Sequence, residues 1–222
     1  MALDTYANLK ASIEDWSHRN DVTAKIDDFI DIAESEMYRD EIDQRGSVVS
    51  KGLMLRDMEY RANPTTAPTT RFLALPTTDS GGNTIRFLKM RKIKITSGGE
   101  DYEVRYRAPE AMNVKSGTDK PRYFTITSQI EFDRIPSGTI EMSYYGTIKD
   151  LDSTNTTNVI LTDHPDIYLH GSLWALFMWA SNYDKAQFHY QQFRKAITGA
   201  NKRDERARRG SAPAINTEGS TP

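Results

Sequence analysis

The sequence has no cysteine, which excludes disulfide scaffolds, zinc ribbons, iron–sulfur sites and thiol catalysis. It also has no apolar run near the roughly 20 residues that a bilayer-spanning helix needs. The start, Met1-Ala2-Leu3-Asp4, lacks the basic and then apolar pattern of a signal peptide. With 37% hydrophobic residues, the chain is too apolar for intrinsic disorder. We therefore expect a globular protein that is used without export and has no membrane partner.

Neither sign of charge dominates, since 29 Lys and Arg residues face 31 Asp and Glu residues, but the charges are unevenly placed. Residues 1–45 contain 12 acids and 5 bases, whereas residues 194–209 contain 7 bases and 2 acids. An acidic front and a basic end suit head-to-tail packing of copies, or an acidic partner for the basic end. Composition does not choose between the two.

Catalytic motifs are missing as well. The sequence contains neither a Gly-x-Ser-x-Gly elbow nor a P-loop. None of the histidines forms a His-x-x-x-His or Glu-x-x-His pair, so we interpret all of them as structural. They are His18, His164, His170 and His189. We predict no catalytic residue, no metal and no cofactor.

Two acidic segments could hold a cation but have simpler interpretations. Carboxylates at positions 27, 28, 31, 34 and 36 lie between the apolar positions of a helix, where charges usually stay solvated. The run Asp150-x-Asp152-x-Thr154 opens like a calcium loop. However, Asn155 stands where the turn glycine belongs and Leu161 where the bidentate glutamate belongs. We interpret it as a surface loop.

The two ends of the chain carry helical periodicity. Apolar residues predict a helix near residues 6–16 and an amphipathic helix of about 20 residues after Asn20-Asp21, which Gly46 ends. His164-Pro165-Asp166 begins a helix that is apolar nearly all round from 167 to 179. Asn182-Tyr183-Asp184 then starts a last helix. Its apolar seam is Ala186, Tyr190, Phe193, Ile197 and Ala200.

The middle of the chain is predicted to form loops and strands. Residues 62–84, rich in threonine and proline, predict a loop with a short extended piece at 72–75. Alternating residues from 92 to 106 and from 123 to 144, separated by short turns, predict an antiparallel meander. The fold class is therefore α+β: a helical bundle formed by both chain ends, with a small inserted antiparallel β subdomain. Its expected parts are 1–61, 62–157, 158–209 and the polar tail 210–222.

Two basic clusters bear on partners. Five bases between 86 and 94 precede acids at 100, 101 and 103 across a predicted hairpin, so cross-strand pairing explains much of this cluster. The C-terminal cluster is our candidate partner-binding site. It comprises Lys202, Arg203, Arg206, Arg208 and Arg209. The alternative is an ordinary solvated helix end. A pI near 6.1 disfavours specific DNA reading.

Several motifs together resemble the head-to-tail adaptor (neck connector, or head-completion) proteins of short-tailed bacteriophages. They include Ile26-x-x-Phe29-Ile30-x-Ile32-Ala33-Glu34, Phe72-x-x-Leu75-Pro76, Pro121-Arg122-Tyr123-Phe124 and the block 161–171. Each motif alone is weak, but their order over residues 5–200 is specific. The stretch 62–84 and the tail depart from the family pattern.

The resemblance implies a structural virion protein without enzymatic activity. It would be assembled in the host cytoplasm into a ring, typically of twelve copies, in the neck between head and tail. Its partners would be further copies of itself, the portal, the tail tube or nozzle and tail fibres, with DNA only passing through the channel on ejection. Two alternatives stay open: a nucleic-acid-binding assembly factor that uses the basic clusters, and an enzyme of unrecognised type. We also expect the β subdomain to contact a neighbour, and residues 201–222 to become ordered on a partner.

Overall fold

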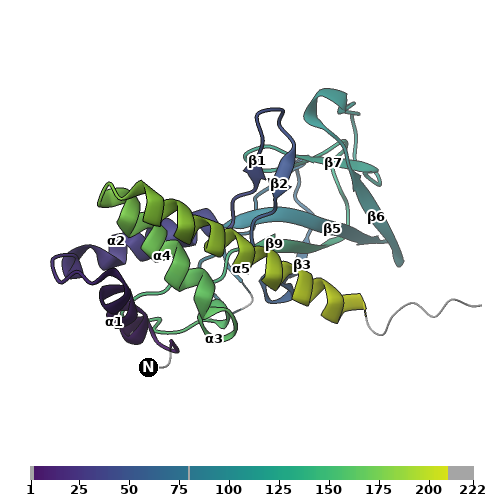
Figure 1. Cartoon of the computed structure of the whole chain (residues 1–222). Coiled ribbons are helices and arrows are strands. Elements are labelled where there is room, and N and C mark those ends of the chain that lie inside the picture. The colour runs from purple at the N-terminus through teal and green to yellow at the C-terminus, as the bar shows by residue number, and fades with distance from the viewer. Residues whose placement is uncertain (1–2, 80, 210–222) are drawn as a thin grey trace, which may run out of the picture. The chain divides into compact units, whose positions relative to one another are not determined.

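The computed structural model describes residues 3–79 and 81–209. Within them the chain is mixed α+β, with five α-helices and a curled seven-stranded sheet (Figure 1). The α+β class agrees with the sequence-based prediction. The chain divides into two compact units, one comprising residues up to 55 and from 160 onward, the other residues 56–159. The predicted polar tail, 210–222, lies outside the described residues.

The first unit contains most of the helices and one short β-hairpin. Its elements are α1 (Tyr6–Ser17), the 3-10 turn η1 (Thr23–Lys25), α2 (Ile26–Met37), β1 (Glu41–Ile42), β2 (Val48–Ser50), α4 (Pro165–Trp179) and α5 (Tyr183–Arg209), with α3 (Val159–Asp163) at the unit boundary. Helix α4 packs against α1, α2 and α5. It is the most apolar helix of the unit, as its sequence predicts, and nine of its residues are buried.

Helix α2 is shorter than predicted, and Gly46 does not end it. The helix stops at Met37, and the chain then forms the β1–β2 hairpin, with Gly46 at φ +78° in its turn. The carboxylate of Asp43 accepts the backbone N–H groups of Arg45 and Ser47, both at 2.8 Å. An aspartate that binds the backbone two and four residues ahead favours a turn over a continued helix. Asn20-Asp21, whose side chains have the chemistry of a helix N-cap, do not cap α2, because Lys25 occupies that position.

The starts of the C-terminal helices agree with prediction. Pro165 begins α4, and the Asn182 side chain accepts the backbone N–H of Lys185 at the start of α5. Four seam residues of α5 are at most 2% exposed: Ala186, Phe193, Ile197 and Ala200. Between α4 and α2 the backbones approach closely at Gly171, where a methyl group would lie 2.8 Å from the Ala33 Cβ atom.

The second unit is built around the curled sheet. Its strands are β3 (Glu59–Thr66), β4 (Phe72–Leu73), β5 (Phe87–Ser97), β6 (Glu100–Tyr106), β7 (Tyr123–Ile126), β8 (Ile130–Phe132) and β9 (Thr139–Gly146), with 3-10 turns η2 (Arg56–Met58) and η3 (Pro109–Ala111). The strand order is β3-β9-β5-β6-β7-β8-β4. Ten buried residues make its core: Ile85, Ile93, Ile95, Val104, Phe124, Ile130, Phe132, Ile140, Met142 and Tyr144.

The predicted antiparallel meander is wrong in two places. Strand β9 pairs with β5 and β3 instead of β8, and β6 pairs with β7 in parallel. A parallel pair needs a crossover of about a dozen residues or more, which the segment 107–122 supplies. The buried Asp133 side chain holds the return by accepting the backbone N–H groups of Arg122 at 3.0 Å and Tyr123 at 3.2 Å.

The predicted loop at 62–84 is in part a strand. Residues 59–66 form β3, which pairs antiparallel with β9 along its length except at a register shift between Ala62 and Thr65. Pro64 lies in that interval, where its missing N–H removes no regular ladder bond. Proline therefore marks an irregularity at a sheet edge here and does not end the strand.

Candidate functional site

The predicted partner-binding bases lie on the last turns of α5. Lys202, Arg203, Arg206 and Arg208 are exposed, and for Arg209 the backbone alone is described. The Arg208 guanidinium also forms an ion pair at 2.7 Å with Asp204, one turn earlier. Bases at this end complement the partial negative charge of the helix C-terminus. The structure thus brings the cluster together on one helix end, and its role stays a prediction.

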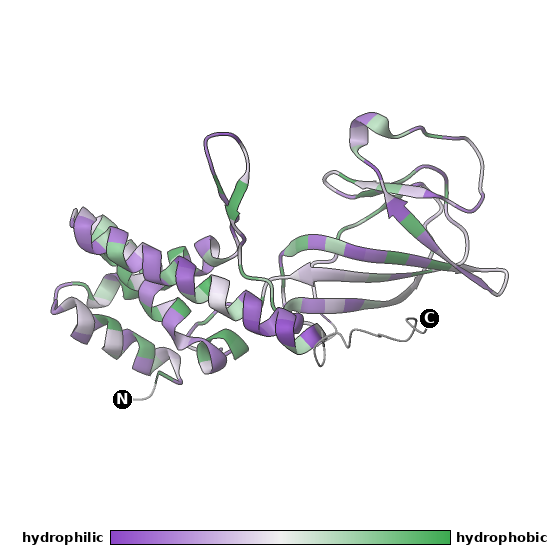
Figure 2. Cartoon of the chain, turned by 45° about the vertical axis from the view of Figure 1, so that its right-hand side comes forward, coloured by the Kyte–Doolittle hydropathy of each residue, from purple (hydrophilic) through white to green (hydrophobic). Residues whose placement is uncertain are grey.

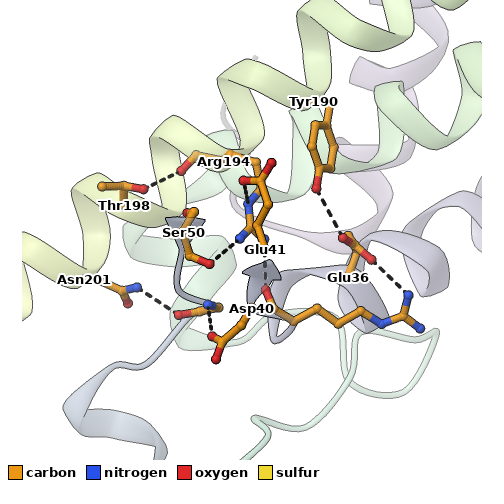
Figure 3. Close-up of polar contacts among 10 residues, drawn as sticks. Glu36, Asp40, Glu41, Ser50, Tyr190, Arg194, Thr198 and Asn201 are labelled. Atoms are coloured by element: carbon orange, nitrogen blue, oxygen red, sulfur yellow. Dashed lines mark hydrogen bonds and ion pairs between the residues drawn. The ribbon is translucent and has the colours of Figure 1, made fainter. Parts of the chain in front are cut away.

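Two turns before this cluster, Arg194 fixes the β1–β2 hairpin to α5 (Figure 3). Its guanidinium donates to the backbone oxygens of Arg39 and Ser50, both at 3.0 Å, and lies 3.5 Å from a carboxylate oxygen of Glu41. Arg194 is only 6% exposed. A buried cation that binds both flanks of a hairpin holds it as a charge-assisted clamp.

Asn201 repeats this anchoring two turns further along α5 (Figure 3). Its side-chain amide donates to the backbone oxygen of Gly52 at 2.9 Å and accepts the backbone N–H of Met54 at 2.8 Å. The Asp40 carboxylate accepts the Gly52 N–H at 2.8 Å from the other side of the hairpin. The base of the hairpin is therefore fixed through polar contacts that no local sequence pattern predicts.

Beyond this base, the hairpin presents apolar side chains to solvent. Ile42, Val48 and Val49 are 60%, 50% and 65% exposed. Ile42 and Val48 are direct cross-strand partners, so their side chains lie on one face. Figure 1 shows the hairpin as a narrow finger pointing away from the helices of its own unit, and Figure 2 shows its apolar strand in green. Sequence periodicity does not reveal this surface, because it predicts Ile42 at the end of a helix and leaves Val48 and Val49 just beyond it.

The sequence predicts that the carboxylates of α2 stay solvated, and this prediction is wrong for Glu34. Glu34 is 3% exposed and accepts a hydrogen bond from the Tyr168 hydroxyl of α4 at 2.8 Å. Asp27 accepts the Tyr6 hydroxyl at 2.7 Å and pairs with Lys10 at 2.6 Å. These carboxylates therefore join α2 to α4 and α1 through hydrogen bonds and an ion pair.

Two of the histidines, 19 residues apart, form a pair between α4 and α5. The Nδ1 atoms of His170 and His189 lie 3.0 Å apart, and the His189 ring stacks on Phe177. Burial lowers the pKa of His170, and burial with the nearby His170 and Lys185 charges lowers the pKa of His189 to about 4. Both rings are therefore neutral near pH 7, and one donates its proton to the other.

The basic cluster on β5 is largely paired, as the hairpin pattern predicts. Lys92 lies 3.1 Å from Glu103, and Lys94 lies 3.2 Å from Asp101 and 2.9 Å from Glu141 of β9. This pairing leaves less positive charge for nucleic acid than the sequence suggests.

The segment around Asp152 forms a local turn. The Asp152 carboxylate accepts the backbone N–H groups of Thr154 at 2.5 Å and Asn155 at 2.6 Å. Across residues 3–79 and 81–209, no three His, Asp or Glu side chains are placed to hold one metal ion. In the same residues no helix is both long and apolar enough to cross a membrane.

An anchored hairpin with exposed apolar side chains, together with a basic helix end, is typical of a protein that works by packing against other proteins. A family model described as SU10 adaptor protein matches residues 4–216. The chain therefore belongs to the SU10 adaptor protein family of phage head-to-tail adaptors, which confirms the resemblance found in the sequence. No curated protein matches the chain. Membership implies a structural role in the virion neck, in association with components such as the portal and tail.

Proposed function

We propose that this chain forms a closed ring, of twelve copies as is typical of such adaptors, between the portal and the tail tube or nozzle. The ring completes the head after packaging and leaves an axial channel for DNA ejection. In each subunit the helices from both chain ends form one body, into which residues 62–157 are inserted. The observation that carries the proposal is the family match, which spans nearly the whole chain.

The distribution of charge supports this arrangement. The first 45 residues are acidic and residues 194–209 are basic, so one copy offers opposite charges to the next. A ring closes through heterologous contacts in which each copy presents two different faces. The exposed bases at the end of α5 then bind either the neighbouring copy or an acidic surface on the portal.

Electron microscopy of the purified protein with its portal tests the proposal. We expect rings seated on the portal, with the α5 end at one interface. A monomer that never associates with the portal would contradict the ring. Retention on DNA that falls steeply with salt would instead support the nucleic-acid-binding alternative.

A further inference from the structure

We propose that the β1–β2 hairpin of one copy docks beside β5 of a second copy. The inference rests on the proposed ring, since it needs copies held next to one another. The segment that docks at β5 is residues 40–50 of an identical chain. Three properties of the described residues support it, namely an incomplete hairpin, an open strand edge and opposite charges.

The hairpin is incomplete by itself. In the described residues β1 and β2 pair only with each other, so both outer edges are unpaired. An isolated two-stranded hairpin is marginal in water, and exposed edges invite another strand. The paired, exposed Ile42 and Val48 add an apolar face with no cover in their own unit. The polar anchors at Arg194 and Asn201 hold the base and leave this face available.

The second unit contains a matching open edge. Strand β5 pairs with β9 from Phe87 onward but with β6 only from Ile93 onward, so residues 87–92 have one unpaired edge among the described strands. At this point β6 leaves β5 and continues beside β7. The divergence opens a groove of about 550 Å³. Apolar residues that line it include Phe87, Leu88, Met90, Tyr106 and Ile126.

The groove fits an extended, partly apolar segment. Tyr106 at its rim is 60% exposed, and Phe124 and Val104 are buried beneath it. A strand added at the free edge of β5 would gain backbone hydrogen bonds, while alternate side chains entered the groove. Ile42 and Val48 lie side by side on one face of the hairpin, so both can place their side chains in the groove.

The charges are complementary. The groove lining carries four bases, Lys89, Arg91, Lys92 and Arg105, and one acid, Glu103. Residues 40–50 of the hairpin carry three acids and one base. Lys89 and Arg105 form no ion pair among the described residues, so they are available to a partner strand. Opposite charge steers the hairpin to this edge and disfavours the pairing of two grooves or two hairpins.

Cysteine cross-linking tests the contact directly, because the natural chain has no cysteine. Two single variants, Val48→Cys and Tyr106→Cys, carry different tags and are mixed under assembly conditions with mild oxidation. We expect a disulfide-linked dimer that contains one copy of each variant. The control replaces Tyr106→Cys by Val114→Cys, because Val114 is 50% exposed and does not line the groove. The docked pair should give about tenfold more dimer, since docking keeps its sulfurs in reach.

The outcomes separate this proposal from that of the ring. If rings form but Val48→Cys links equally well to Tyr106→Cys and to Val114→Cys, or to neither, the docking is overturned and the ring proposal stands. In a variant that carries both cysteines, a disulfide that forms only within one chain, and never between two chains, would also overturn the docking. The absence of both rings and links would contradict both proposals. Ile126→Cys provides a second position in the groove if Tyr106→Cys fails to fold.

Discussion

The guanidinium of Arg194 donates a hydrogen bond of 3.0 Å to the backbone oxygen of Ser50, across 144 residues of sequence. This contact joins the long C-terminal helix α5 to the β1–β2 hairpin of the N-terminal segment within one compact unit. Helix α5 therefore has two roles: its apolar seam packs in the core, and Arg194 positions the exposed β1–β2 hairpin.

Arg194→Met should release the hairpin base and lower the free energy of unfolding by about 2–4 kcal/mol, because buried carbonyl oxygens lose their donor. Hydrogen exchange at the Gly52 and Leu53 amides should accelerate most, since both amides are bonded within the anchored segment. Lys195→Met is the matched control, because Lys195 is exposed on the same helix and should change stability by less than about 0.5 kcal/mol. Equal effects of the two substitutions would show that Arg194 is no clamp.

Gly171→Ala should destabilise the helical unit by about 1–3 kcal/mol through overpacking. The added methyl group would lie 2.8 Å from the Ala33 Cβ atom and 2.9 Å from a ring carbon of Phe193. Gly199→Ala is the control: nothing lies within 4 Å of its added methyl, so it should stabilise α5 by up to about 1 kcal/mol. Thermal denaturation measures the stability of both variants. The double variant Gly171→Ala/Ala33→Gly should recover part of the lost stability, because it removes the closest contact of the added methyl group.

Stability should fall as the pH drops from about 6.5 to about 4. The pKa of His189 is lowered to about 4 in the folded chain, so the unfolded chain binds more protons in this window. After allowance for solvent screening, the loss from this group is about 1–2 kcal/mol, complete near pH 4. His189→Gln should flatten this part of the stability curve relative to the unsubstituted chain. Chemical denaturation at several pH values measures both slopes.

Reversing the charge of the C-terminal arginines together should abolish attachment to the neighbouring copy or to the portal and leave the fold intact. The variant changes Arg203, Arg206, Arg208 and Arg209 to glutamate. Exposed pairs contribute about 0–1 kcal/mol each, so we expect the effect to come from their sum. A control with the same net charge changes four exposed lysines elsewhere: Lys51, Lys115, Lys149 and Lys185. Infectious particles built from the arginine variant would identify the cluster as an ordinary solvated helix end.

Local chemistry made much of the secondary structure predictable. Pro165 and Asn182 began their helices as expected, and Gly98-Gly99 turned the β5–β6 hairpin with both residues at positive φ. Such signals are contained in a few neighbouring residues, so one sequence is enough to detect them. The family was predictable for a related reason, since several short motifs in fixed order are specific even where each is weak.

The α+β class, the apolar seam of α5 and the membership of the adaptor family could all be predicted from the sequence. Three features become visible only in the folded chain: the parallel β6–β7 pair, the burial of Glu34 against Tyr168 and the clamp of Arg194 on the hairpin. These contacts join residues 18 to 155 positions apart, and their energies depend on burial and geometry that periodicity does not encode. The exposed face of Ile42 and Val48 belongs to the second group, because a one-residue change of register in that hairpin would turn it over.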